Sequence, residues 1–167
     1  MDGPVAIVGY MGSGKTTVGR TLARSLGWEF VDLDRTIVKG AGRGIPEIFR
    51  ESGEDHFRDL EHRALLDALD GSRERVVACG GGVVVRLENR KLLESAATVF
   101  LEEDVEILYG RTRGPDRPLR AASREEFGRR YAQRLPLYKE VADLEAVVAG
   151  RPPGEVAQEI ARWLPSA

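Results

Sequence analysis

The sequence contains Gly9-Tyr10-Met11-Gly12-Ser13-Gly14-Lys15-Thr16, which matches the pattern G-x-x-x-x-G-K-S/T. An apolar segment, 5–8, precedes it directly, and a helical pattern, about 15–26, begins at its end. Glycines allow the backbone of such a loop to fold around an anion with its N–H groups inward, and the N-terminus of the following helix adds its positive end. The pattern and its position together predict a phosphate-binding loop.

The last residues of the loop have separate expected roles. We expect Lys15 to reach the β- and γ-phosphates of a bound nucleotide and the Thr16 hydroxyl to ligate Mg²⁺, one ion per chain. The predicted nucleotide-binding residues of the loop are Gly12, Ser13, Gly14, Lys15, Thr16 and Thr17. GTPases, motor domains and kinases share this kind of loop, so other residues must choose among them.

Apolar segments alternate with helical patterns along the chain. The apolar segments, at 5–8, 30–32, 76–79, 98–101 and 144–148, are short and continuous, which is typical of parallel strands covered on both faces. The helical patterns lie at about 15–26, 54–69, 87–96, 105–112 and 154–164. This alternation predicts a three-layer α/β/α fold with a five-stranded parallel sheet, formed by one domain over residues 1–167.

Two stretches interrupt this alternation. The segment 39–53 is rich in glycine, yet it carries Ile45, Ile48 and Phe49 at helical spacing, so we expect a short helix on a mobile flap. The stretch 113–123 (RGPDRPLRAAS) suits a mobile lid better than a core element. The expected substrate-binding region spans about residues 33–61.

Asp32 and Asp34 stand at the end of the second predicted strand, where an open α/β sheet places its ligand crevice. One acid can hold a water in the magnesium shell, and the other can accept a hydrogen bond from an attacking hydroxyl. We assign Asp32 to the first role and Asp34 to the second. The alternative is that Asp34 caps a helix beginning at Arg35.

Arg58 and Glu61 are three residues apart on a predicted helix, so the acid can orient the arginine while it binds a carboxylate. The alternative is an exposed ion pair on the helix surface. Gly80, Gly81 and Gly82 follow the third predicted strand, and three glycines allow the backbone to press against a ligand. A plain flexible turn is the alternative there.

Composition excludes several classes of protein. A net charge of −2 argues against a broad nucleic-acid or membrane footprint. Cys79 is the single cysteine, which argues against a disulfide framework and fits a reducing cytoplasm. No apolar run approaches the roughly 18 residues of a spanning helix. We therefore expect a cytoplasmic protein, and a monomer because no spare apolar helix face is evident.

The chain resembles shikimate kinases over essentially its whole length. The resemblance is carried by motifs in matching order and spacing, namely GYMGSGKTTVGRTLA at 9–23, Asp32-x-Asp34, GRGIPEIF at 42–49, FRDLE at 57–61, the triple glycine, Arg117-Pro118-Leu119 and RLPLY at 134–138. Many families share the phosphate-binding loop, whereas the combination with the other motifs is specific.

This resemblance implies a function and a set of site residues. The implied reaction is transfer of the γ-phosphoryl group of ATP to the 3-hydroxyl of shikimate, within chorismate and aromatic amino acid biosynthesis. Lys15, Asp34 and Arg117 are then catalytic, Arg117 closing over the transferring group from the lid. The implied shikimate-binding residues are Asp34, Arg58, Glu61, Gly80, Gly81, Gly82 and Arg134, with apolar walls from Ile45, Phe49, Phe57, Pro118 and Leu119. The further implied ATP contacts are Arg111, Arg117, Arg151 and Pro153.

Two other readings remain. A gluconate or nucleoside monophosphate kinase shares the architecture, but two arginines aimed at one carboxylate favour shikimate over a nucleotide acceptor. The alternative from another functional class is a non-catalytic module that senses a nucleotide or a metabolite. The presence of Lys15, Asp34 and Arg117 argues for activity.

Overall fold

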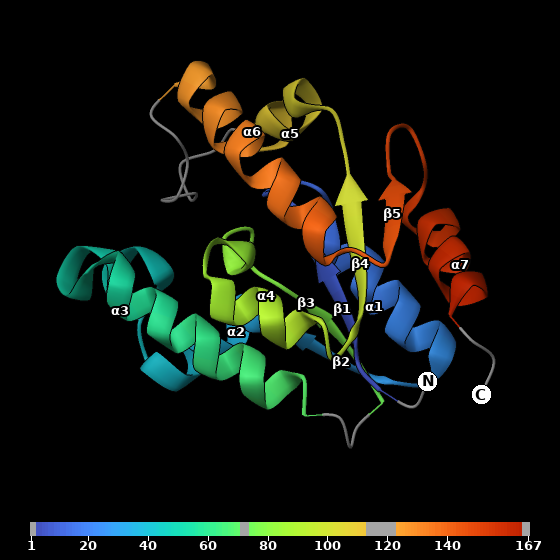
Figure 1. Cartoon of the computed structure of the whole chain (residues 1–167), viewed down its shortest axis with the longest axis horizontal. Coiled ribbons are helices and arrows are strands. Elements are labelled where there is room, and N and C mark those ends of the chain that lie inside the picture. Colours follow the sequence, from blue (N-terminus) through green and yellow to red (C-terminus); the bar gives the residue numbers. More distant parts are fainter. Residues whose placement is uncertain (1–2, 71–73, 113–122, 165–167) are drawn as a thin grey trace.

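The computed structural model describes residues 3–70, 74–112 and 123–164 (Figure 1). These residues form one five-stranded parallel sheet with strand order β2-β3-β1-β4-β5. The strands are β1 (Val5–Val8), β2 (Glu29–Asp32), β3 (Arg75–Ala78), β4 (Ala97–Glu102) and β5 (Leu144–Val147). Each predicted strand is present within two residues of its expected ends, and the predicted α/β class is confirmed.

The described residues also form seven α-helices and one 3-10 turn. They are α1 (Lys15–Leu26), α2 (Leu33–Ala41), α3 (Ile45–Ala68), η1 (Val83–Val85), α4 (Leu87–Leu93), α5 (Val105–Arg111), α6 (Arg124–Val141) and α7 (Pro153–Trp163). The predicted helix at 87–96 is shorter than expected, because its last residues leave the helix before β4 begins.

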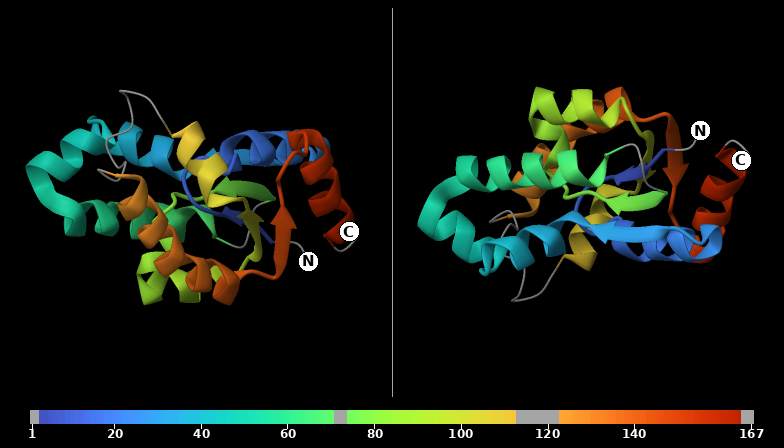
Figure 2. Two further views of the ribbon diagram at one scale, coloured as in Figure 1. Left: turned by 90° about the horizontal axis from the view of Figure 1, so that it is seen from above. Right: turned by 90° about the horizontal axis from the view of Figure 1, so that it is seen from below.

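The two faces of the sheet bury separate hydrophobic clusters. Along β1, Val5 and Ile7 join the cluster that packs against α1 and α7. Ala6 and Val8 join the cluster contributed by α2, α3, α4 and α6. Figure 2 shows α1 and α4 on opposite sides of the sheet in both views. Because successive residues of a strand point to opposite faces, all four residues of β1 are buried, and the three-layer arrangement is confirmed.

The flap is more helical than expected. Helix α2 begins at Leu33, and α3 runs from Ile45 to Ala68 with one non-helical residue, Gly53 (φ 81°, ψ 171°). The short helix predicted near Ile45 and the helix predicted at 54–69 are therefore two segments joined at a kink. An extended backbone with positive φ is almost confined to glycine, which explains why the kink falls there.

Helix α6 was not predicted. It carries Pro136 inside the helix, and its apolar positions are few, so hydrophobic periodicity does not reveal it. A start signal is nevertheless present, since the Ser123 hydroxyl caps the helix by accepting a hydrogen bond from the Glu126 N–H. The predicted lid, 113–123, lies outside the described residues apart from Ser123.

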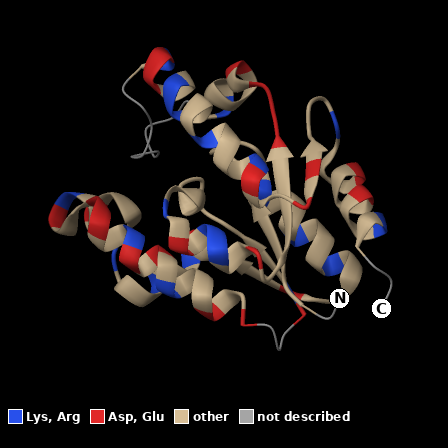
Figure 3. Cartoon of the chain, in the orientation of Figure 1, with Lys and Arg blue, Asp and Glu red and all other residues tan. Residues whose placement is uncertain are grey.

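Basic and acidic residues are interspersed along α3 and α6 (Figure 3). Among the described residues, no helix is both long and apolar enough to cross a bilayer.

Candidate active site

The phosphate-binding loop connects β1 to α1, as predicted. Gly12 and Gly14 have φ values of 86° and 89°, a region that other residues rarely adopt. The Gly14 carbonyl accepts a hydrogen bond from Val18 N at 2.9 Å, so α1 starts directly at the loop. The Nζ of Lys15 donates to the Tyr10 carbonyl at 3.0 Å, which holds the lysine over the loop. The loop thus presents a helix N-terminus and a cation to the same small volume.

Ser13 is the most enclosed polar residue of the loop. Its side chain is buried, and its hydroxyl has no hydrogen-bond partner among the described residues. A β-carbon on Gly9 would lie 2.8 Å from this hydroxyl and 3.0 Å from the Leu101 carbonyl. Gly9 is therefore required by close packing of the loop.

The Thr16 hydroxyl donates to Oδ2 of Asp32 at 3.0 Å. The other carboxylate oxygen of Asp32 accepts from Arg35 N at 3.2 Å and caps α2. The suggested cap at Asp34 is therefore wrong in position, because the helix starts two residues earlier than that alternative required. A hydroxyl and a carboxylate side by side are the oxygen donors that Mg²⁺ prefers, so these residues fit a magnesium site completed by phosphate and water.

Asp34 and Glu61 converge on the turn after β3. A β-carbon on Gly80 would lie 3.0 Å from Oδ1 of Asp34 and 2.9 Å from Oε1 of Glu61. Desolvation by surrounding protein raises the pKa of Asp34, although Lys15 opposes the shift and the carboxylate still presents surface to the cavity. Desolvation likewise raises the pKa of Glu61, against the opposing charge of Arg58. The glycines after β3 are thus a close backbone approach to two acids, and not merely a flexible turn.

Arg58 and Glu61 form a buried ion pair. Nη1 of Arg58 lies 2.7 Å from Oε2 of Glu61, and the two residues are 6% and 1% exposed. The exposed surface pair is therefore the wrong alternative. Burial disfavours the charge of Arg58, but Glu61 and Glu54 outweigh it and raise its pKa. A β-carbon on Gly82 would lie 2.3 Å from Nη1 of Arg58, so the guanidinium group rests directly on this glycine.

Arg134 reaches the same turn from α6. Its Nη1 donates to the Gly81 carbonyl at 3.3 Å, and its guanidinium carbon lies 5.5 Å from the centre of the Tyr10 ring. The Tyr138 hydroxyl also donates to the Gly81 carbonyl. Gly81 in turn approaches the phosphate loop, since a β-carbon added to this glycine would lie 3.3 Å from Met11 N. One turn therefore contacts the phosphate loop and a predicted carboxylate-binding arginine.

These groups line one cavity of about 880 Å³. It contains the predicted residues Asp34, Ile45, Phe49, Phe57, Arg58, Glu61, Gly80, Gly81, Gly82 and Arg134. The rings of Phe49 and Phe57 are 4.8 Å apart and form part of its apolar wall. The cavity thus has a cationic region, an acidic group and an apolar wall, which suits a small anionic molecule with hydroxyl groups.

Of the described residues predicted to contact ATP from outside the loop, Arg111 contacts the loop, whereas Arg151 contacts residues elsewhere. Arg111 donates to the Gly12 carbonyl at 3.1 Å and pairs with buried Glu103 at 3.2 Å. Arg151 instead contacts the Val147 carbonyl at 2.9 Å and Glu159 at 2.6 Å. Pro153 is the first residue of α7, and Thr17 is exposed on α1. Arg117, Pro118 and Leu119 lie outside the described residues.

Several cavity residues were missed. They are Tyr10, Met11, Val38, Pro46, Glu54, Val85, Arg130, Gln133 and Leu137. Arg130, Gln133 and Leu137 share a face of α6 with Arg134, so recognition of this helix from its Ser123 cap would have found them. Glu103, buried beside Arg111, carries no sequence signal, because burial of a single glutamate depends on the whole fold.

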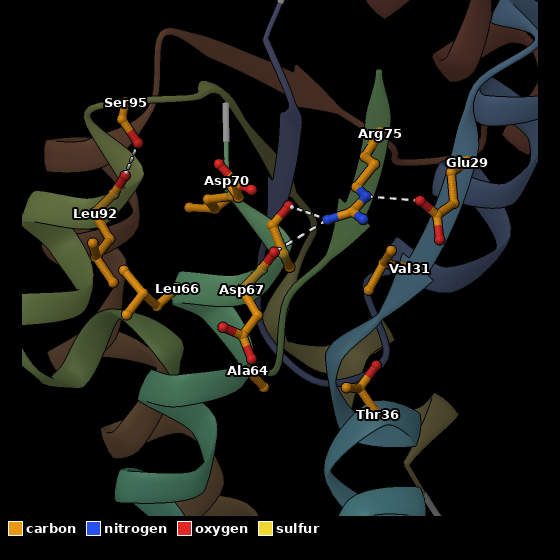
Figure 4. A pocket seen from close by; sticks show the side chains of 12 residues that line it. Glu29, Val31, Thr36, Ala64, Leu66, Asp67, Asp70, Arg75, Leu92 and Ser95 are labelled. Carbon is orange, nitrogen blue, oxygen red and sulfur yellow. Dashed lines mark hydrogen bonds and ion pairs between the residues drawn. The ribbon is translucent and has the colours of Figure 1, made fainter. Parts of the chain in front are cut away.

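A second cavity of about 740 Å³ lies beside the edge strand β2 (Figure 4). Its buried cation, Arg75, is engaged by Glu29 at 2.7 Å and by the carbonyls of Asp67 and Ala68 at 3.1 and 3.5 Å. Arg75 therefore ties α3 to the sheet. No described residue of the phosphate loop lines this cavity.

The phosphate-binding loop contacts the same turn as a pocket lined by Asp34 and by three arginines, Arg58, Arg130 and Arg134. This arrangement is that of a P-loop kinase that acts on small anionic metabolites. The family model for shikimate kinase matches residues 11–165. The chain belongs to the shikimate kinase family, and it is accordingly an ATP-dependent kinase.

Individual relatives agree over nearly the full length. A shikimate kinase of Persephonella marina is 40% identical, and the match covers 93% of this chain and 95% of the relative. A solved shikimate kinase from Acinetobacter baumannii in complex with shikimate is 35% identical, with a TM-score of 0.87 and coverage of 98% and 96%. The shikimate kinase of Aquifex aeolicus is 33% identical, with a TM-score of 0.84 and coverage of 95% and 94%.

Proposed function

We propose that this chain transfers the γ-phosphoryl group of ATP to the 3-hydroxyl of shikimate, giving shikimate 3-phosphate and ADP. The observation that carries the proposal is the turn at 80–82, which contacts the phosphate loop through Gly81 and the acceptor pocket through Gly80 and Gly82. Because both reactants would meet at this turn, an acceptor hydroxyl can lie in line with the terminal phosphate.

Asp34 acts on the acceptor hydroxyl. It lies next to Gly80 in the cavity, and its raised pKa suits a group that accepts a proton or orients the nucleophile. Lys15 belongs to the phosphate loop, is the positive charge that acts most strongly on Asp34, and offsets the negative charge of the transferring group. These two residues divide the site into an acceptor side and a donor side.

Arg58 and Arg134 bind the carboxylate of shikimate. Arg58 is oriented by buried Glu61, and Arg134 is positioned by the Gly81 carbonyl. Guanidinium groups recognise carboxylates through paired N–H donors, so two of them fix the ring and select an acid. Phe49 and Phe57 pack along its apolar part.

Further residues act on the nucleotide side of the site. Thr16, together with Asp32 through a water, holds one Mg²⁺, which supplies charge neutralisation on the phosphates when bound. Arg111, Arg151 and Pro153 contact the adenosine part. From the lid at 113–123, Arg117 stabilises the transferring group, and Pro118 and Leu119 cover the acceptor.

A single domain spans residues 1–167, with the substrate-binding region at about 33–61 and the lid at about 113–123. The protein acts as a monomer in the cytoplasm, without nucleic-acid or membrane partners. A sedimentation mass of twice the chain mass would contradict the monomer.

The test is coupled ADP release with Mg²⁺ and ATP, comparing shikimate, gluconate, AMP and no acceptor at equal concentrations. We expect turnover with shikimate and background rates with the others. Comparable turnover with gluconate would overturn the substrate assignment. If folded protein that binds ATP released no ADP with any acceptor, the result would favour a sensing module.

A further inference from the structure

Arg58 has two acidic partners that differ sharply in their surroundings. Nη1 contacts Glu61, whose side chain is 1% exposed, whereas Nη2 contacts Oε1 of Glu54 at 3.2 Å. The Glu54 side chain is 60% exposed and lines the cavity. Glu61 is therefore a permanent partner inside the protein, while Glu54 can leave Arg58 by rotating into water.

The contact with Glu54 uses only half of one edge of the guanidinium group. The Nε and Nη2 atoms form an edge whose two N–H groups match the two oxygens of a carboxylate. Nη2 of Arg58 donates to Glu54, while Nε is buried and has no hydrogen-bond partner among the described residues. A buried donor without a partner is costly, so this edge would gain from a carboxylate that reaches both atoms.

The backbone at Glu54 makes such an exchange local. Glu54 directly follows the kink at Gly53 and begins the second segment of α3, four residues before Arg58 on the same face. The Arg58 group itself is held by Glu61 and pressed on Gly82, so it is the fixed member of the pair. The exchange then needs rotation of one exposed side chain and no movement of the helix.

We propose that Glu54 is a placeholder for the substrate carboxylate: it occupies Nη2 of Arg58 until the acid of the acceptor takes the Nε–Nη2 edge. This inference rests on the proposed function, in which Arg58 binds that acid. Binding then exchanges one carboxylate for another. Arg58 therefore has a second acidic partner besides Glu61 both before and after the substrate binds. A neutral ligand cannot compete with Glu54 for the arginine, so its binding would leave this ion pair in place.

The test is Glu54→Gln, which removes the charge and keeps the shape. We expect KM for shikimate to fall about two- to fivefold, the range set by loss of a partly exposed ion pair, while KM for ATP stays at the wild-type value. The matched control is Asp59→Asn on the same helix. Asp59 pairs with Arg86 at 2.7 Å, is similarly exposed, and does not line the cavity. We expect no change in KM for shikimate with this control.

A second measurement separates competition from a general effect on the pocket. The methyl ester of shikimate lacks the acidic charge, so its Kd, measured by calorimetry, should be the same for wild type and Glu54→Gln. An unchanged or higher KM for shikimate in Glu54→Gln would overturn the placeholder role, as would an equal gain for the ester. Failure of the wild-type enzyme to phosphorylate shikimate would instead refute the proposed function itself.

Discussion

Gly82 is a single residue whose lack of a side chain makes room for the acceptor pocket. Its backbone angles, φ −100° and ψ 3°, are accessible to alanine, so the glycine is not required by conformation. It is required by space, because a β-carbon there would lie 2.3 Å and 2.4 Å from the two terminal nitrogens of Arg58. Any side chain at this position displaces the arginine.

Gly82→Ala should therefore weaken acceptor binding selectively. Overpacking costs about 1–3 kcal/mol, so we expect KM for shikimate to rise by about tenfold or more, with a small change in KM for ATP. Steady-state kinetics with each substrate varied gives both values. Gly154→Ala on α7 is the control, since its β-carbon would meet no atom within 4 Å. An unaltered KM for shikimate in Gly82→Ala would mean that Arg58 does not bind the acceptor.

Asp34 predicts the acid side of the pH dependence. Its carboxylate must be ionised to accept a proton. Although Asp34 has exposed surface in the cavity, desolvation by the surrounding protein raises its pKa above the ordinary value of about 3.9. As pH falls through this raised pKa, kcat/KM for shikimate should decline, at a higher pH than an ordinary aspartate would give. A pH–rate profile measures this limb. A limb at or below the ordinary aspartate value would contradict the role.

Asp34→Asn tests the same residue in two ways. Phosphoryl transfer should be lost while ATP binding is retained, and near-wild-type turnover would remove Asp34 from the mechanism. Because the folded protein binds more protons than the unfolded chain, ionisation of Asp34 lowers stability as pH rises through its raised pKa. The asparagine variant lacks this loss of stability. The difference obtained by subtracting the wild-type Tm from the variant Tm should therefore be larger at pH 7 than at pH 3.

At the scale of the element, α3 is divided by Gly53, and Arg58 follows the kink by just over one turn. Gly53→Ala should destabilise the fold by about 1–3 kcal/mol, because its φ of 81° and ψ of 171° suit glycine almost exclusively. It should also raise KM for shikimate. Denaturant unfolding and kinetics measure the two effects. The control is Gly40→Ala in α2, which has no neighbour within 4 Å of the added carbon and should be neutral or slightly stabilising.

Local signals explain which elements were predictable. Buried parallel strands read as continuous apolar runs, and α1 follows a loop whose glycines and lysine are a strong pattern. Helix α6 escaped because its stability comes from packing of Phe127 and Tyr138 against distant elements, while Pro136 opposes the helix locally. Arg134 was recognised from its motif, but its position over Tyr10 depends on α6.

For the molecule as a whole, the reactivity of the single cysteine measures global unfolding. Cys79 is 2% exposed at the end of β3, and burial raises the pKa of its thiol, so it should react with a thiol reagent only after unfolding. Substrates that bind the folded state at about 100 times their Kd should slow this labelling about 100-fold. Thiol labelling followed by absorbance measures the rate. Rapid labelling that substrates do not slow would indicate local opening around β3.

The phosphate loop, the five strands and the family resemblance were predictable from the sequence, because they depend on neighbours along the chain: glycines in the loop, short apolar runs and residues at a set spacing. The three-dimensional fold was needed to show that Arg58 and Glu61 are buried, that Asp32 rather than Asp34 caps α2, and that Glu54 contacts Arg58 at the cavity. Burial and desolvation arise from segments far apart in the sequence, so the electrostatic character of the site emerges only when β3, α3 and α6 come together.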